Sequence, residues 1–207
     1  MNNVHFGGRE TMHPAVTSKE EILAVSRDLI CTRGWAAVNI RAVAASCGIS
    51  VGAVYNYFQS KEELMEELVE SVWRDIFACT EKEEVFSQIE TCLTWLFQRM
   101  EYGADRYPGF FTSHSSNFLM GQKEAGRRRM GDTWRHMIEG LCEVLQKDPA
   151  ISQDAFDQSF TREDFAGILF SLMLSALLRG VYDPRPAIEL TRRVLYERGW
   201  AEAGTQK

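Results

Sequence analysis

The sequence predicts an all-α protein with a small N-terminal helical domain and a larger C-terminal helical domain. Three observations support this. Apolar residues recur at helical spacing along most of the 207 residues. No segment shows the alternation of a strand, and residues 39–64 form two short helices around a glycine. We place a disordered arm at residues 1–16, a helix-turn-helix domain at 17–62 and the larger domain at 63–207.

The first helix begins at Thr17 or Ser18, since each has a glutamate three residues later and can form a capping box. Gly34 is expected to end it. Its inner face consists of Ile22, Val25, Ser26, Leu29 and Ile30.

The next two helices form the helix-turn-helix. Asn39 caps the first of them, whose apolar face is Ile40, Val43, Ala44 and Cys47. Gly48 ends it, because glycine adopts a left-handed backbone without steric cost. Ser50 caps the second helix, expected over 51–58, while Ile49 and Val54 can form a hydrophobic staple. In such motifs the second helix enters the DNA major groove.

The second helix begins with small residues and ends with polar tips. Small side chains at Val51, Gly52 and Ala53 permit close approach to a groove, and the polar tips of Tyr55 and Asn56 can reach phosphates and base edges. An ordinary amphipathic surface helix is the alternative reading. The predicted DNA contacts are Asn39, Arg41, Ser50, Val51, Gly52, Ala53, Tyr55, Asn56, Tyr57 and Lys61.

The run from Ile22 to Leu64 resembles the DNA-binding domain of the TetR/AcrR family of bacterial repressors. The resemblance depends on Gly34-Trp35, Val43-Ala44, Cys47-Gly48-Ile49-Ser50-x-Gly52, Tyr55-x-Tyr57-Phe58 and Lys61-Glu62-x-Leu64. It implies a homodimeric repressor that leaves a palindromic operator on double-stranded DNA when the C-terminal domain binds a small effector.

A long fourth helix is expected to connect the two domains. Ser60 and Glu63 give its capping box. Its apolar stripe is Leu64, Met65, Leu68, Val69, Val72, Trp73, Ile76 and Phe77. A further stripe from Val85 to Met100 is expected to end at Gly103 and Pro108.

Three more helices are predicted after a polar and aromatic stretch. They cover residues 123–145, 165–178 (capped by Thr161 and Asp164) and 186–198, and residues 147–160 are polar and turn-like. The resemblance implies that the last two helices form a four-helix bundle in a dimer. The predicted dimer interface is Phe165, Leu169, Leu172, Leu190, Val194 and Leu195.

Large apolar side chains in the second domain could line an effector cavity, although plain core packing explains each of them singly. The resemblance therefore carries this prediction. The predicted ligand-binding residues are Trp95, Phe110, Phe111, His114, Asn117, Phe118, Trp134, Met137 and Met173.

Charge is distributed unevenly. Residues 1–61 carry six basic against four acidic side chains, while the rest carries 17 against 25, giving −6 in all. A mildly basic N-terminal domain followed by an acidic C-terminal domain is consistent with a protein that contacts phosphates through its N-terminal domain only. Five cysteines without metal-ligand spacing suggest reduced thiols in a cytoplasmic protein, with a redox switch left open. We expect no signal peptide, membrane span, metal or cofactor.

Catalytic motifs are missing from the sequence, so we expect no enzyme. Two alternatives stay open beside the effector-controlled repressor. One is an effector-free architectural or partner-binding protein of the same fold, and the other is a helical enzyme or lipid carrier with a vestigial head.

Overall fold

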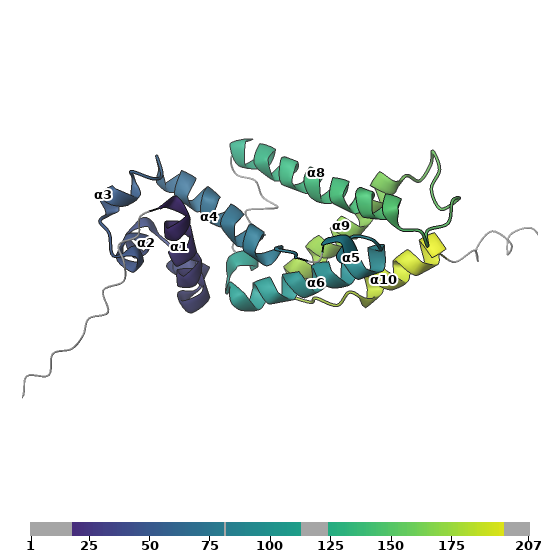
Figure 1. Cartoon of the computed structure of the whole chain (residues 1–207), viewed down its shortest axis with the longest axis horizontal. Coiled ribbons are helices and arrows are strands. Elements are labelled where there is room, and N and C mark those ends of the chain that lie inside the picture. Colours follow the sequence, from purple (N-terminus) through teal and green to yellow (C-terminus); the bar gives the residue numbers. More distant parts are fainter. Residues whose placement is uncertain (1–17, 81, 113–123, 197–207) are drawn as a thin grey trace, which may run out of the picture. The chain divides into compact units, whose positions relative to one another are not determined.

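The computed structural model describes residues 18–80, 82–112 and 124–196, with the side chains of 82 and 124–134 excluded. The predicted N-terminal arm lies outside this part of the chain. All regular structure in the described ranges is helical, as predicted (Figure 1). The chain divides into two compact units after Val72. The sequence places the boundary ten residues earlier, at the start of the helix that the division cuts.

The first unit is built from α1 (Lys19–Arg33), the 3-10 turn η1 (Trp35–Ala37), α2 (Ile40–Cys47) and α3 (Val51–Val54). Ser18 begins α1 with a reciprocal capping box, in which Ser18 and Glu21 exchange backbone-to-side-chain bonds of 3.1 Å. Gly34 ends it at φ 76°. The buried core is formed by Ile22, Leu29, Val43, Ala44, Cys47, Val54, Phe58 and Leu64.

Helix α4 (Lys61–Ile76) begins with a variant of the predicted cap. The Glu63 N–H donates to Ser60 Oγ at 3.0 Å, as expected, but the Glu63 carboxylate accepts from the Gln59 N–H at 2.6 Å instead of the Ser60 N–H. Lys19 of α1 forms ion pairs with Glu63 and Glu67, at 3.6 and 2.5 Å. These pairs attach α1 to the first half of α4.

The second unit contains α5 (Lys82–Val85), α6 (Ile89–Arg106), α8 (Glu124–Lys147), α9 (Arg162–Arg179), α10 (Arg185–Thr191) and the π-helical turn η2 (Arg192–Tyr196). Helix α8 packs against α9, and α6 contacts both α8 and α10. The reciprocal cap predicted for α9 is present at Thr161 and Asp164. The helix predicted over 186–198 is present as α10 and η2, which are helical from Arg185 to Tyr196, while residues 197 and 198 lie outside the described part.

Gly103 does not end a helix, contrary to the prediction. It is buried inside α6, which continues to Arg106. A Cβ at Gly103 would lie 2.7 Å from Ile76 Cδ1 and 3.0 Å from Phe111 Cζ. The glycine is therefore required for close packing of α6 against the last turn of α4. Val85, predicted in the same stripe as α6, belongs to the separate helix α5.

Asp148 is a buried carboxylate in a segment that the sequence describes only as polar. Its side chain accepts the Ile89 N–H at 2.9 Å, the Ala150 N–H at 2.9 Å and the Tyr196 hydroxyl at 2.6 Å. It thereby connects the start of α6, the end of α8 and the C-terminal turn. Burial, and then the bond to Asp148, raise the pKa of Tyr196.

Candidate nucleic-acid interface

The turn between α2 and α3 has the geometry of a helix-turn-helix. Asn39 Oδ1 accepts the Ala42 N–H at 3.0 Å and begins α2. Gly48 ends it in the left-handed conformation, at φ 68° and ψ 24°. The Ile49 N–H then returns to the Ala44 carbonyl at 3.0 Å, which closes the turn.

Ser50 caps α3, as predicted. Its hydroxyl accepts the Ala53 N–H at 3.0 Å. The predicted length of this helix is wrong, because α3 ends at Val54 and not at Phe58. The N–H groups of Tyr57 and Phe58 both donate to the Val54 carbonyl, at 3.0 and 3.1 Å, so the chain tightens into a turn. This turn directs Phe58, which is almost fully buried, into the core.

Most of the predicted DNA contacts are exposed in the first unit. The exposed ones are Asn39, Arg41, Ser50, Gly52, Tyr55, Asn56 and Lys61; Val51, Ala53 and Tyr57 are half-buried. Tyr57 packs against the core, whereas 45% of the Tyr55 surface is exposed. A Cβ at Gly52 would meet only Ser50 Oγ, at 3.7 Å. The protein's own packing therefore does not require a glycine there, which leaves close approach by another molecule as a reason for it.

The polar side chains of this surface differ in how many hydrogen bonds and ion pairs they form within the protein. The Asn39 amide caps α2 and also donates to the Ala37 carbonyl at 3.2 Å, so both ends of it are occupied. Arg41 and Lys61 make no ion pair with any residue that the structure describes. Their positive charges, which precede and follow α3 in the sequence, are therefore available to phosphates.

The structure does not gather the predicted effector residues into one cavity. Phe110 is fully buried beside Trp73, with ring centroids 5.4 Å apart, and Trp95 packs between Phe77 and Phe86 at 6.0 and 5.5 Å. Met173 is part of the buried core cluster, and the partly buried Met137 packs against it. Four further predicted positions, His114, Asn117, Phe118 and the Trp134 side chain, lie outside the described part.

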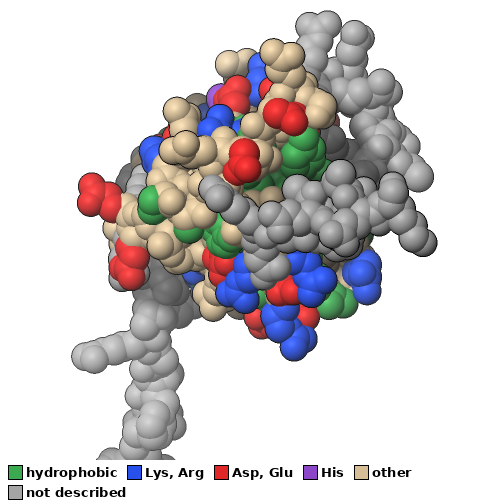
Figure 2. Space-filling model, turned by 90° about the vertical axis from the view of Figure 1, so that its right-hand side faces the viewer, with side chains coloured by type: hydrophobic (Ala, Val, Ile, Leu, Met, Phe, Trp, Pro, Cys, Tyr) green, Lys and Arg blue, Asp and Glu red, His purple; other side chains and the backbone are tan. Residues whose placement is uncertain are grey.

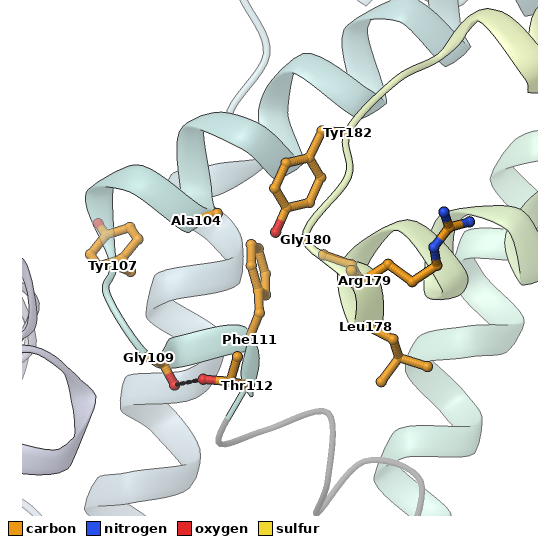
Figure 3. Close-up of a pocket in the computed structure, with 10 residues that line it drawn as sticks. Ala104, Tyr107, Gly109, Phe111, Thr112, Leu178, Arg179, Gly180 and Tyr182 are labelled. Carbon is orange, nitrogen blue, oxygen red and sulfur yellow. Dashed lines mark hydrogen bonds between the residues drawn. The ribbon is translucent and has the colours of Figure 1, made fainter.

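A cleft of about 240 Å³ lies in the second unit and contains Phe111 from the predicted set. The ends of α6 and α9 and the segments that follow them form its walls (Figure 3). Sequence reasoning missed the rest of its lining, because helical periodicity does not mark the residues that follow a helix end. The larger side chains in the lining are Tyr107, Phe111, Leu177, Leu178, Arg179 and Tyr182.

Half of the predicted dimer interface is buried within the chain itself. Phe165, Leu169 and Leu195 are each at most 1% exposed. They pack in the core of their own chain and offer no surface to a partner, so their assignment to the interface is corrected. Leu172 and Leu190 are half-buried, and Val194 is 38% exposed. The exposed large apolar side chains of this region are Ile168, Leu178, Val181 and Val194.

The arginines near the C-terminal end of the described chain are paired with acids. Arg192 bonds Glu90 at 2.6 Å and Arg193 bonds Glu189 at 2.6 Å. On the face in Figure 2, basic and acidic side chains lie beside one another, with hydrophobic side chains reaching the surface among them. Neutralised arginines of this kind make a weak site for a nucleic acid.

Neither a metal site nor a membrane span is found in the described ranges. No group of three or more metal-ligating side chains occurs there, and no helix is long and apolar enough to cross a bilayer. All five cysteines are free thiols. Burial raises the pKa of the Cys92 thiol to about 12.

The capped α2, the left-handed glycine turn and the exposed α3 together define a helix-turn-helix protein. Residues 22–68 match the sequence profile described as "Bacterial regulatory proteins, tetR family". The first unit is therefore the DNA-binding domain of a TetR-family regulator.

Curated relatives resemble the chain to different extents. It is 25% identical over 143 residues to the nucleoid occlusion factor SlmA of Idiomarina loihiensis, covering 67% of this chain and 71% of SlmA. It is 32% identical over 60 residues to the transcriptional repressor KstR2 of Mycolicibacterium smegmatis, covering 29% of each. The SlmA match is long enough to extend beyond the first unit.

Solved structures share the fold. A transcriptional regulator from Rhodococcus sp. RHA1 superposes with a TM-score of 0.61 at 18% identity, covering 88% of this chain and all of that one. BioQ bound to its double-stranded DNA operator superposes with a TM-score of 0.51 at 17% identity, covering 84% of this chain and 95% of BioQ. These similarities concern the architecture alone.

Proposed function

We propose that this regulator is a repressor that binds a palindromic operator as a homodimer and is released by a small, largely apolar effector. One observation carries the DNA-binding part of the proposal: the capped, small-faced α3 is flanked in the sequence by two exposed and unpaired cations, Arg41 and Lys61. The name of the relative KstR2, a transcriptional repressor, supports repression.

Different residues of this surface have different proposed roles. Arg41, Val51, Ala53 and Asn56 contact base edges, which are distinguishable in the major groove. The proposed phosphate contacts are Ser50, Tyr55, Tyr57 and Lys61, and Asn39 and Gly52 complete the surface. Because the Asn39 amide is already occupied, its contribution is to fix α2. Tyr57 can offer only its hydroxyl edge, since the ring packs on the core.

A twofold dimer explains how a short helix gains specificity. Two copies of α3 set one helical turn apart, roughly 34–36 Å, read two half-sites of a palindrome. The exposed apolar side chains Ile168, Leu178 and Val194 are the proposed contacts between the two copies. The dimer has one conformation in which the spacing of its two DNA-binding units fits the operator and another in which it does not. An effector that binds the second conformation more tightly releases the DNA.

Binding to the DNA upstream of the protein's own gene tests this proposal. Fluorescence anisotropy across a salt series should give specific binding whose affinity falls with salt. Lys61→Ala should weaken binding to all duplexes and reduce the salt slope by about 1, whereas Arg41→Ala should also relax sequence preference. Arg33→Ala is the control, because it removes an exposed positive charge, in the last turn of α1, that is not among the predicted DNA contacts. Equal losses in all three variants would refute the interface.

The match to SlmA favours a second candidate, since it extends over more of the chain than the DNA-binding unit. In that case the chain is an effector-free DNA-binding protein that recruits a partner through its body. Mapping occupied sites across the genome separates the two. A repressor should occupy a few promoters, and a nucleoid-associated factor should occupy many sites irrespective of promoters.

A further inference from the structure

Helix α3 is too short to fix its own orientation. It comprises the four residues Val51–Val54, and a single helical turn has little stability of its own. Its end is defined by the turn at residues 55–59, in which the N–H groups of Tyr57 and Phe58 donate to the Val54 carbonyl. Contacts that immobilise this turn therefore also fix the direction of α3.

Lys19, the first residue of α1, contacts both this turn and the start of α4. Its ammonium group lies over the Phe58 ring, 5.0 Å from the ring centroid. The same group donates to Glu67 Oε1 at 2.5 Å and lies 3.6 Å from Glu63 Oε1. The second oxygen of Glu63, Oε2, accepts the Gln59 N–H at 2.6 Å. Lys19 therefore has one partner in the turn and two in α4, and one of those two is itself bonded to the turn.

This arrangement requires a positive charge at position 19. The face of an aromatic ring attracts a cation, and the Phe58 ring is held in place by its burial. Glu63 and Glu67 are four residues apart on α4, a spacing at which two like charges destabilise a helix. A neutral side chain at position 19 would leave these two carboxylates without the ammonium between them and the ring without its cation.

The ion pairs distinguish Lys19 from the cations proposed to contact DNA. Arg41 and Lys61 are exposed and make no ion pair within the described part of the chain, whereas two carboxylates neutralise the charge of Lys19. A phosphate would have to displace both carboxylates before it could gain from this cation. The contacts of Lys19 therefore indicate a role inside the DNA-binding unit.

Other contacts hold α1 against α4 when Lys19 is removed. Ile22 and Leu64 are fully buried in the core of this unit. Further along the two helices, Arg27 donates to the buried hydroxyl of Ser71. Removal of the Lys19 ammonium should therefore loosen the turn after α3 and leave the packing of the two helices intact.

We propose that Lys19 is a positioning residue for DNA recognition: its ammonium group holds the turn at residues 55–59 against α1 and α4, and thereby fixes the orientation of α3, without contacting DNA. This inference depends on the proposed function for its effect on operator affinity. Its effect on the turn is independent of DNA and is measured separately.

Hydrogen exchange of the full-length protein without DNA, followed by mass spectrometry, tests the effect on the turn. Lys19→Met keeps an unbranched apolar side chain and removes the ammonium, so the amides of residues 57–59 should exchange about threefold faster, as expected for the loss of one exposed cation–π contact. Lys19→Arg keeps the charge and should exchange at the wild-type rate. Amides at residues 22–30, inside α1, should not change in either variant.

Three results of this experiment would each overturn the proposal. They are unchanged exchange of residues 57–59 in Lys19→Met, an equal acceleration inside α1, and exchange of Lys19→Arg as fast as that of Lys19→Met. The second result would mean that the lysine contributes only general stability.

Operator affinity, measured by fluorescence anisotropy, tests the effect on recognition. Glu63→Gln with Glu67→Gln removes two negative charges from the DNA-binding unit, which by charge alone should strengthen binding. Because this pair also releases Lys19, we expect binding to be about threefold weaker, the same factor as for the turn. The matched control, Glu20→Gln with Glu62→Gln, removes two exposed acids from the first turns of the same two helices and should not weaken binding.

The sign of the change decides between positioning and direct contact. Stronger binding by the Glu63 and Glu67 pair would refute positioning, because it would mean that a released Lys19 binds phosphate. Equal weakening by the control pair would also refute it. Absence of DNA binding in every form, the wild type included, refutes the proposed function, while hydrogen exchange still decides whether Lys19 holds the turn.

Discussion

A methyl group added at Gly103 should destabilise the protein, although alanine is the better helix former. The new Cβ would lie 2.7 Å from Ile76 Cδ1, 3.0 Å from Ile76 Cγ1 and 3.0 Å from Phe111 Cζ. Ile76, which makes the shortest of these contacts, is fully buried, so its side chain has no free space to move into. Overpacking of this kind costs about 1–3 kcal/mol.

The intrinsic helix preference of alanine offsets about 1 kcal/mol of that cost. We therefore expect Gly103→Ala to lower the free energy of unfolding by about 1 kcal/mol. For a chain of this size, that corresponds to a fall in melting temperature of about 2–4 °C. Thermal unfolding followed by circular dichroism, with urea titration as a second method, measures the change.

Two comparisons make the result decisive. Gly140→Ala, in α8, places its Cβ where no atom lies within 4 Å, so it should raise the stability by about 1 kcal/mol. Ile76→Val removes the Cδ1 atom at 2.7 Å, so Gly103→Ala should cost less in that background. If Gly103→Ala is as stabilising as Gly140→Ala, or if its cost is unchanged beside Ile76→Val, the close contact between α6 and α4 is wrong.

Three further predictions concern the caps and the buried titratable groups. Ser50→Ala removes the cap of α3 and should lower the free energy of unfolding by about 1 kcal/mol, which urea unfolding measures. Ser50→Asp keeps a cap but adds a negative charge, so it should lower the affinity for DNA, which fluorescence anisotropy measures. Asp148→Asn should cost about 2–3 kcal/mol in urea unfolding, because it places an amide donor among three donors. Burial raises the pKa values of Tyr107 and Cys92 to about 12, from 10.0 and 9.0, so the free energy of unfolding should fall as pH rises through 9–12.

Each of these has a result that contradicts it. Equal DNA affinity of Ser50→Asp and the wild type would remove Ser50 from the phosphate contacts. Wild-type stability of Asp148→Asn would mean that the buried carboxylate does not hold the C-terminal turn. An unfolding free energy that stays level or rises between pH 9 and 12 would show that the tyrosine and the thiol ionise as readily in the folded state as in the unfolded one.

Local sequence chemistry was sufficient for the DNA-binding unit. Ser18, Asn39 and Ser50 cap their helices and Gly48 ends α2, because a cap depends on a side chain and on N–H groups at most three residues away. The family resemblance depended on the same short-range pattern, and residues 22–68 matched the family. Where the prediction was wrong, at the end of α3, burial of Phe58 outweighed helix continuation.

The second unit shows what the sequence could not give. In the sequence, Gly103 has the features of a helix terminator. The structure shows instead that Ile76, 27 residues earlier, packs closely against it. In the sequence, Asp148 is one polar residue among several in a polar segment. The structure shows that it accepts hydrogen bonds from Ile89 at the start of α6 and from Tyr196 at the end of η2.

By itself, the sequence determined the helix class, the caps and the family, because these depend on neighbours along the chain. Only the tertiary structure decided which apolar residues of α9 are buried in their own core and which aromatic side chains surround a cleft. Both depend on packing between helices far apart in sequence, and an apolar residue carries no local mark of the partner that will cover it.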